Sequence, residues 1–82
     1  MAIAGVLLTV PKEDQDLVGQ ALEAIPEVVQ FAPTPDNAQI QGLALVLECP
    51  AKDLTKRLED LGQIPGVLDV GLTYAEYSDD LD

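Results

Sequence analysis

The sequence predicts an α+β fold in which four strands form one antiparallel sheet and two helices cover one side of it. Three observations lead to this prediction: the second half of the chain repeats the first, each half has two apolar runs of strand length, and each half has a helical apolar pattern between prolines. A shift of 39 residues superimposes identical residues, among them Leu8 and Leu47, Pro11 and Pro50, Leu22 and Leu61, Ile25 and Ile64, Pro26 and Pro65, and Val28 and Val67. Each half is therefore expected to form strand, helix, strand.

The first half begins with an apolar run that predicts a strand over residues 3–10. Pro11 stands where a helix can begin, because the first turn of a helix does not use the N–H group that proline lacks. Apolar residues then recur on one helical stripe, formed by Leu17, Val18, Ala21, Leu22 and Ile25. Because Ile25 precedes a proline, the helix should end near Ala24, and a second strand is expected over residues 27–32.

The second half repeats this order after a turn-rich loop at residues 33–39. Strands are expected over residues 40–49 and 67–75, and the helix between them should begin after Pro50 and end near Gln63. Its apolar stripe is formed by Leu54, Leu58 and Leu61, with Ala51 and Ile64 at the ends. Two interleaved right-handed βαβ units of this kind predict a ferredoxin-like βαββαβ sandwich, with spatial strand order 4-1-3-2 and both helices on one face.

The length and composition predict a single globular domain. A chain of 82 residues can bury only one core, and 48% hydrophobic and 23% charged residues are ordinary for a folded domain. We expect the domain to comprise residues 1–76 and an acidic C-terminal tail to comprise residues 77–82.

Side chains alternate along a strand, so each predicted strand can be divided between two faces. The helix-covered face should carry Val6, Leu8, Val10, Val29, Phe31, Leu45, Leu47, Cys49, Leu68, Val70, Leu72 and Tyr74. The other face should carry Ile3, Gly5, Leu7, Thr9, Val28, Gln30, Ala32, Ile40, Gly42, Ala44, Val46, Glu48, Val67, Asp69, Gly71, Thr73 and Ala75. A solvent-facing sheet surface is normally polar, whereas this one is apolar around three glycines. It therefore predicts a contact surface.

The glycines suggest how a partner would lie on that surface. Glycine in a strand often marks the close approach of another backbone, so Gly5, Gly42 and Gly71 should form a shallow trough with carboxylates at its border. The candidate peptide-binding residues are Ile3, Gly5, Leu7, Thr9, Gly42, Ala44, Val46, Glu48, Asp69, Gly71, Thr73 and Glu76. Two copies of the chain packed through these faces would explain the same pattern, and the acidic tail would also serve simply as a solvated end.

The charge balance favours a cationic partner. Fifteen Asp and Glu residues against four Lys and Arg residues give a formal net charge of −11. Such a field repels nucleic-acid backbones and anionic lipid surfaces, so we expect neither as a partner. The alternative is that the excess acid only keeps a small protein in solution.

The residues needed for catalysis or for a cofactor are missing from the sequence. There is no histidine and only one cysteine, and the glycines follow no phosphate-binding pattern. We therefore expect no enzyme activity, no metal site and no cofactor, and we interpret Cys49 as a buried structural thiol. No basic residue precedes the apolar run at residues 2–10 and no segment reaches about 20 apolar residues, so the expectation is a cytoplasmic protein without membrane insertion.

Several sequence features resemble the NapD family. They are Ile25-Pro26-Glu27-Val28, the third-strand pattern of Gly42, Val46 and Glu48, and the run from Ile64 to Tyr74 followed by acidic residues. The resemblance implies a cytoplasmic chaperone that binds the basic twin-arginine signal peptide of the periplasmic nitrate reductase catalytic subunit before export, as a monomer or weak homodimer. Family members often have histidine after the final tyrosine, whereas Ala75 and Glu76 follow Tyr74 here. This departure leaves open a related exported molybdoenzyme as the client.

A second function remains open at the level of sequence. Effector domains of leucine-responsive regulators share the predicted topology and a Pro-Gly-Val segment before a strand, which corresponds here to Pro65-Gly66-Val67. The chain would then be a stand-alone domain that senses a small molecule or mediates oligomerisation. Against this, those domains usually accompany a DNA-binding module, and the sequence contains none.

Overall fold

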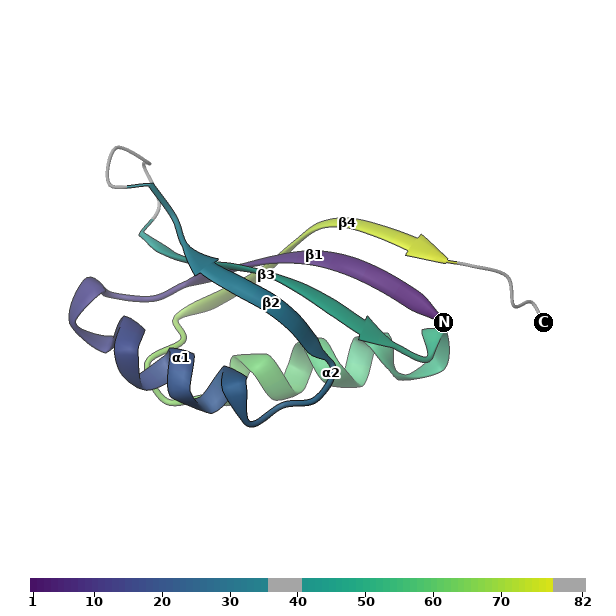
Figure 1. The fold of residues 1–82 in the computed structure, drawn as a ribbon, viewed down its shortest axis with the longest axis horizontal. Helices are drawn as coiled ribbons and strands as arrows, with labels where there is room; N and C mark the ends of the chain where they lie inside the picture. The colour runs from purple at the N-terminus through teal and green to yellow at the C-terminus, as the bar shows by residue number, and fades with distance from the viewer. Residues whose placement is uncertain (36–40, 78–82) are drawn as a thin grey trace.

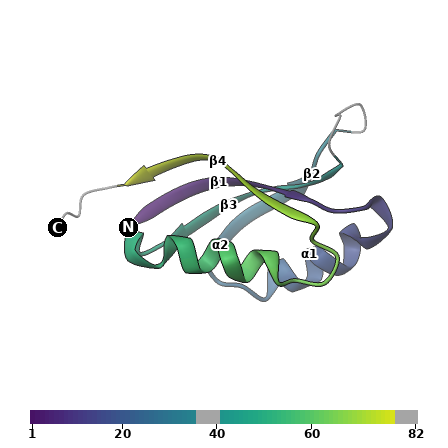
Figure 2. The same ribbon diagram turned by 180° about the vertical axis from the view of Figure 1, so that it is seen from behind.

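The chain forms a four-stranded antiparallel sheet with two helices on one side (Figures 1 and 2). The computed structural model describes residues 1–35 and 41–77. Its elements are β1 (Ala2–Thr9), the 3-10 turn η1 (Lys12–Asp14), α1 (Gln15–Glu23), β2 (Val28–Pro33), β3 (Gly42–Cys49), the 3-10 turn η2 (Ala51–Asp53), α2 (Leu54–Gly62) and β4 (Asp69–Tyr77). The spatial order β2-β3-β1-β4 confirms the predicted order of strands. This arrangement is compatible with a ferredoxin-like sandwich.

The sequence repeat appears in the structure as two copies of the same local geometry. Pro11 and Pro50 have nearly the same extended backbone, with φ/ψ of −57°/147° and −56°/140°, and each leads through one 3-10 turn into a nine-residue helix. After each helix, the Ile-Pro pair forms a turn that a backbone hydrogen bond closes. The Val28 N–H donates to the Ile25 carbonyl at 3.1 Å, and the Val67 N–H donates to the Ile64 carbonyl at 3.0 Å.

The core lies between the helices and the two central strands. Its buried members are Ala4, Val6, Leu8, Val10, Val18, Leu22, Leu43, Leu45, Leu47, Cys49, Leu54 and Leu61. Every second residue of β1 and β3 takes part, so the alternation predicted for these strands is confirmed. On α1 the stripe is narrower than expected, because Val18 and Leu22 are buried while Leu17 is 57% exposed.

In β2, a bulge interrupts the alternation of faces. Val28 pairs with Leu47 and Gln30 pairs with Val46, so Val29 has no partner on β3. The assignment of Val29 to the core was therefore wrong: Val29 is 55% exposed, and Val28 packs against the core instead. After the bulge, Phe31 returns to the helix side as expected.

A second bulge, in β4, has a larger effect. Val6 pairs with Leu72 and Gly5 pairs with Tyr74, so Thr73 is the extra residue. Because an extra residue shifts all later side chains to the other face, Tyr74 leaves the helix side and Ala75 packs against the core. Both of these positions had been predicted the other way round.

The start of β4 also differs from the prediction. Residues 67 and 68 were expected in the strand, but Val67 belongs to the turn after α2 and packs against the core. Leu68, expected in the core, is 70% exposed. Leu72 lies on the helix side opposite Val6, yet it remains 49% exposed on this outer strand.

Some expectations concern residues that the structure does not describe. Ile40 and most of the predicted loop lie outside the described residues, and so do residues 78–82 of the predicted tail. Tyr77, placed in that tail by the sequence prediction, is the last residue of β4. Within residues 1–35 and 41–77, no helix has the length and apolar character needed to cross a membrane.

Candidate peptide-binding face

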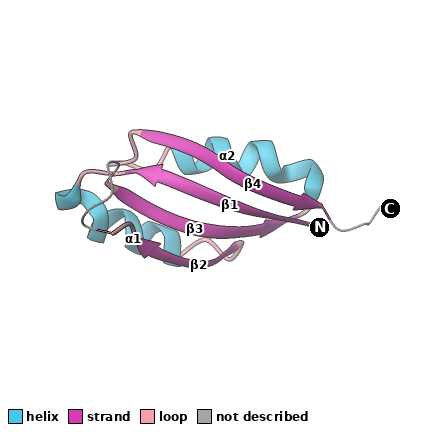
Figure 3. Ribbon diagram, turned by 90° about the horizontal axis from the view of Figure 1, so that it is seen from above, coloured by secondary structure: helices cyan, strands magenta, loops and turns pink. Residues whose placement is uncertain are grey.

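The face of the sheet that the helices leave uncovered, here called the open face, is visible in Figure 3, where the strands lie in front of the helices. Strand pairing arranges its side chains in four rows that cross the strands. From one end to the other, these rows are Glu48–Ile3–Glu76, Gln30–Val46–Gly5–Tyr74, Ala32–Ala44–Leu7–Gly71 and Gly42–Thr9–Asp69. Neighbouring rows are two residues apart along β1, β2 and β3, which is about 7 Å, and on β4 the bulge places Gly71 and Tyr74 three residues apart.

The two central rows form a hollow of about 530 Å³ that extends over all four strands. It is lined by Gly5, Val6, Leu7, Gln30, Phe31, Ala32, Ala44, Leu45, Val46, Thr73 and Tyr74. Five of the predicted binding residues are among them, namely Gly5, Leu7, Ala44, Val46 and Thr73. The other seven lie outside the hollow: Ile3, Glu48 and Glu76 at one end, Thr9, Gly42 and Asp69 at the other, and Gly71 on β4 between them.

The ring of Tyr74 forms one wall of the hollow and lies over Gly5. A Cβ atom on Gly5 would collide with the ring and come within 2.7 Å of Thr73 Oγ1. The Thr73 hydroxyl donates a hydrogen bond of 2.9 Å to the Gly5 carbonyl oxygen, which fixes the bulge against β1. Gly5 is therefore buried beneath an aromatic ring of its own chain and does not form an open trough.

The other two glycines of the predicted trough have different roles. A Cβ atom on Gly42 would overlap the Leu8 carbonyl oxygen, so the strands approach closely there and leave no space for a side chain. A Cβ atom on Gly71 would lie 3.6 Å from its nearest neighbour, the Leu7 carbonyl oxygen, which is an ordinary contact. Close packing within the sheet thus explains Gly42 without reference to a partner, whereas Gly71 is free of this constraint.

The charged side chains of the open face are all acidic. Glu48, Asp69 and Glu76 are all exposed, and they occupy its two ends. The four basic residues of the sequence, Lys12, Lys52, Lys56 and Arg57, all lie in the helical segments. An apolar hollow between carboxylates, with no lysine or arginine side chain on that face, has the charge pattern that complements a basic amphipathic segment.

No family model matches this chain, and no curated protein or solved structure is significantly similar to it.

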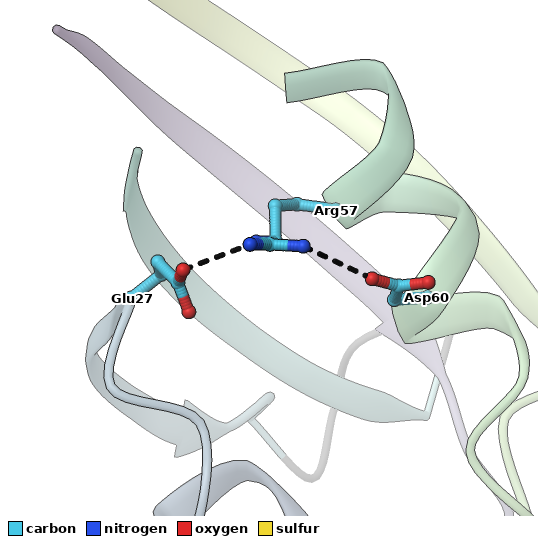
Figure 4. A network of polar contacts seen from close by, with 3 residues as sticks. All are labelled: Glu27, Arg57 and Asp60. Carbon is cyan, nitrogen blue, oxygen red and sulfur yellow. Dashed lines mark hydrogen bonds and ion pairs between the residues drawn. The ribbon is translucent and has the colours of Figure 1, made fainter. Parts of the chain in front are cut away.

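On the helix side, polar contacts have a structural role. Arg57 of α2 donates from Nε to Glu27 Oε2 at 3.1 Å and from Nη1 to Asp60 Oδ2 at 3.3 Å (Figure 4). Glu27 raises the pKa of Arg57, so the guanidinium stays charged at any ordinary pH. The contact joins α2 to the segment just before β2, and this fixes the end of the first βαβ unit against the second helix.

The cysteine thiol and the acidic side chains were the remaining candidates for a reactive group or a metal site. Cys49 is 1% exposed, and burial raises the pKa of its thiol, which makes the thiolate unfavourable. Within the described part of the chain, no group of three or more His, Cys, Asp or Glu side chains is placed to hold a metal ion.

Six residues that line the hollow were missing from the predicted site. Val6, Phe31 and Leu45 belong to or pack against the core on the helix side, as predicted, and the other three have separate explanations. Gln30 and Ala32 were assigned to the open face, where they lie, but were left out of the site because β2 contains none of the glycines on which the site was based. Tyr74 was assigned to the wrong face by strict alternation. One signal was available: alternation from Val70 onwards would place Glu76 in the core, and a buried unpaired carboxylate is so costly that a shift before it is favoured.

Proposed function

We propose that this chain binds a basic amphipathic peptide on its open face, and that its ligand is the twin-arginine signal peptide of an exported molybdoenzyme. The supporting observation is the hollow of about 530 Å³ with exposed carboxylates at both ends and no basic residue on the same face. An amphipathic helix laid into such a hollow buries its apolar side while its cations meet the carboxylates.

The resemblance to the NapD family supports the biological part of this proposal. A cytoplasmic chaperone of this kind would hold the signal peptide of a periplasmic nitrate reductase, or of a related molybdoenzyme, until its cofactor is inserted. In this proposal the chain is a ferredoxin-like binding module without catalytic activity. The open face supplies recognition, and the helices with the Arg57 contacts supply rigidity.

A homodimer formed through the open face is the competing use of the same surface. Each end of that face is acidic, with Glu48 and Glu76 at one end and Asp69 at the other. Two copies stacked face to face would oppose carboxylates in either orientation, and like charges brought together in an interface are costly. Charge therefore favours a cationic peptide over a second copy as the occupant.

The test is a titration of the full chain with a synthetic twin-arginine signal peptide, monitored by calorimetry and, in a parallel NMR experiment, by amide chemical shifts. We expect shifts centred on Leu7, Ala44 and Val46, and weaker binding when both arginines are changed to glutamine. Shifts confined to α1 and α2 would refute the proposed site, and equal affinity for the two peptides would refute the role of charge. Size-exclusion chromatography over a range of concentrations tests the competing homodimer, which requires a stable dimer without peptide.

A further inference from the structure

Tyr74 occupies an unusual position for a large aromatic residue. It is 52% exposed although it packs over Gly5 on the neighbouring strand, so one part of the ring is held by the sheet while the rest faces solvent. Its orientation is set by the bulge at Thr73, which the hydrogen bond to the Gly5 carbonyl stabilises. The chain thus presents an aromatic surface in a fixed place, at the wall of the apolar hollow.

The charges around Tyr74 distinguish it from the rest of the open face. Glu76 lies two residues further along β4 on the same face, and Glu48 lies across Ile3 from Glu76. Both carboxylates are therefore one row, about 7 Å along the strands, from the Tyr74 row. Asp69, at the other end, is two rows away. A π surface and two carboxylates at the same end all attract a cation.

We propose that Tyr74 is the specificity-determining residue of the open face, and that it stacks against an arginine side chain of the bound peptide while Glu48 or Glu76 accepts hydrogen bonds from the guanidinium. A planar guanidinium can stack on a ring and donate sideways at the same time, which an ammonium group cannot do equally well. The site therefore selects arginine over lysine. It also sets the direction of the peptide, with its cationic end over the Ile3 row and its apolar part over Leu7 and Ala44.

This inference rests on the proposed function. The experiment is designed so that a wrong role for Tyr74 and a wrong proposed function give different results. The experiment is a double-mutant cycle by calorimetry, with the wild-type chain, Tyr74→Leu, Tyr74→Phe and Tyr77→Leu, each titrated with the twin-arginine peptide and with the same peptide carrying two lysines. Tyr77 is the matched control, because it is also an exposed tyrosine of β4 but pairs with the buried Ala2 and lies on the helix side. Thermal unfolding of each variant checks that the fold is retained.

We expect the wild-type chain and Tyr74→Phe to prefer the arginine peptide by about three- to tenfold, and Tyr74→Leu to lose most of that preference. Tyr77→Leu should behave as the wild type. The inference is overturned if Tyr74→Leu keeps the full preference for arginine, or if Tyr77→Leu loses it equally. Either result leaves peptide binding intact, whereas absence of binding by the wild-type chain would refute the proposed function itself.

Discussion

The ring of Tyr74 on β4 lies against the Cα atom of Gly5 on β1, and no side chain larger than hydrogen fits between them. We expect Gly5→Ala to displace the ring and to destabilise the fold by about 1 kcal/mol, as overpacking does where one partner can move aside. The displacement should appear in NMR spectra as the loss of contacts between the Tyr74 ring protons and residue 5.

Gly71→Ala is the matched control for this substitution. Gly71 lies in the next row of the same face, where a new methyl group would meet its nearest neighbour at 3.6 Å. Its effect on stability should be within about 0.5 kcal/mol, as for substitutions without a clash. If both variants leave the tyrosine resonances unchanged, the described packing of Tyr74 is incorrect.

Gly42→Ala should be far more damaging than Gly5→Ala. Its methyl group would overlap the Leu8 carbonyl oxygen, which belongs to the backbone and cannot rotate away. The pairing of β1 with β3 would have to shift, so we expect a loss of about 3 kcal/mol or failure to fold. Urea denaturation compares the two variants directly, and similar midpoints for Gly42→Ala and the wild type would contradict the close approach of these strands.

Ala44→Lys should weaken peptide binding strongly without unfolding the protein. Ala44 is exposed and lines the hollow, so a lysine there would extend into the space and bring a positive charge against a cationic ligand. We expect at least a tenfold loss of affinity, about 1.4 kcal/mol. Gln20→Lys on the exposed side of α1 makes the same change of charge on the helix layer, and its affinity should remain close to that of the wild type.

Stability should fall at alkaline pH partly because of Cys49. Burial raises the pKa of this thiol, so above about pH 8.5 the unfolded chain ionises while the folded chain stays protonated. The stability contributed by the neutral thiol is therefore complete below that pH and is lost as the pH rises, at up to about 1.4 kcal/mol per pH unit. Denaturation at pH 7 to 10 should give a shallower decline for Cys49→Ala than for the wild type. Parallel declines would exclude a buried thiol.

The two contacts of Arg57 should differ in their importance for stability. The contact with Glu27 joins residues that are 30 positions apart, whereas Asp60 is three positions further on the same helix. Glu27→Gln should therefore lower the melting temperature more than Asp60→Asn, and high salt should reduce both effects. Since Arg57 does not lose its proton at ordinary pH, this difference should persist from pH 6 to 9. Equal melting temperatures for the two variants would show that the link to β2 contributes little.

The sequence predicted the fold well wherever its apolar pattern was regular. The prolines after the two helices predict their C-terminal ends to within one or two residues of those observed. The uninterrupted alternation of β1 and β3 assigns Val6 and Leu8 to the core and Leu7 to the open face. These features depend on the backbone restriction before proline and on the alternation of side chains along a strand, and both can be recognised from residue types and their spacing.

The errors at Val29, Tyr74 and Ala75 have one physical origin, which is the bulges of the outer strands. Val29 in β2 and Thr73 in β4 are extra residues, and each shifts the side chains near it. A bulge depends on how two strands pair, and residue type alone does not reveal that pairing. The structure therefore places the three carboxylates Glu48, Asp69 and Glu76 on the open face, as expected, and adds Tyr74 to that face.

Because Thr73 is the extra residue of the bulge, deleting it would leave Leu72 opposite Val6 and Tyr74 opposite Gly5, whereas pairing Thr73 itself with Gly5 would exchange the faces of Tyr74 and Ala75. The register of β4, and not only its amino acids, therefore decides which side chains this surface displays.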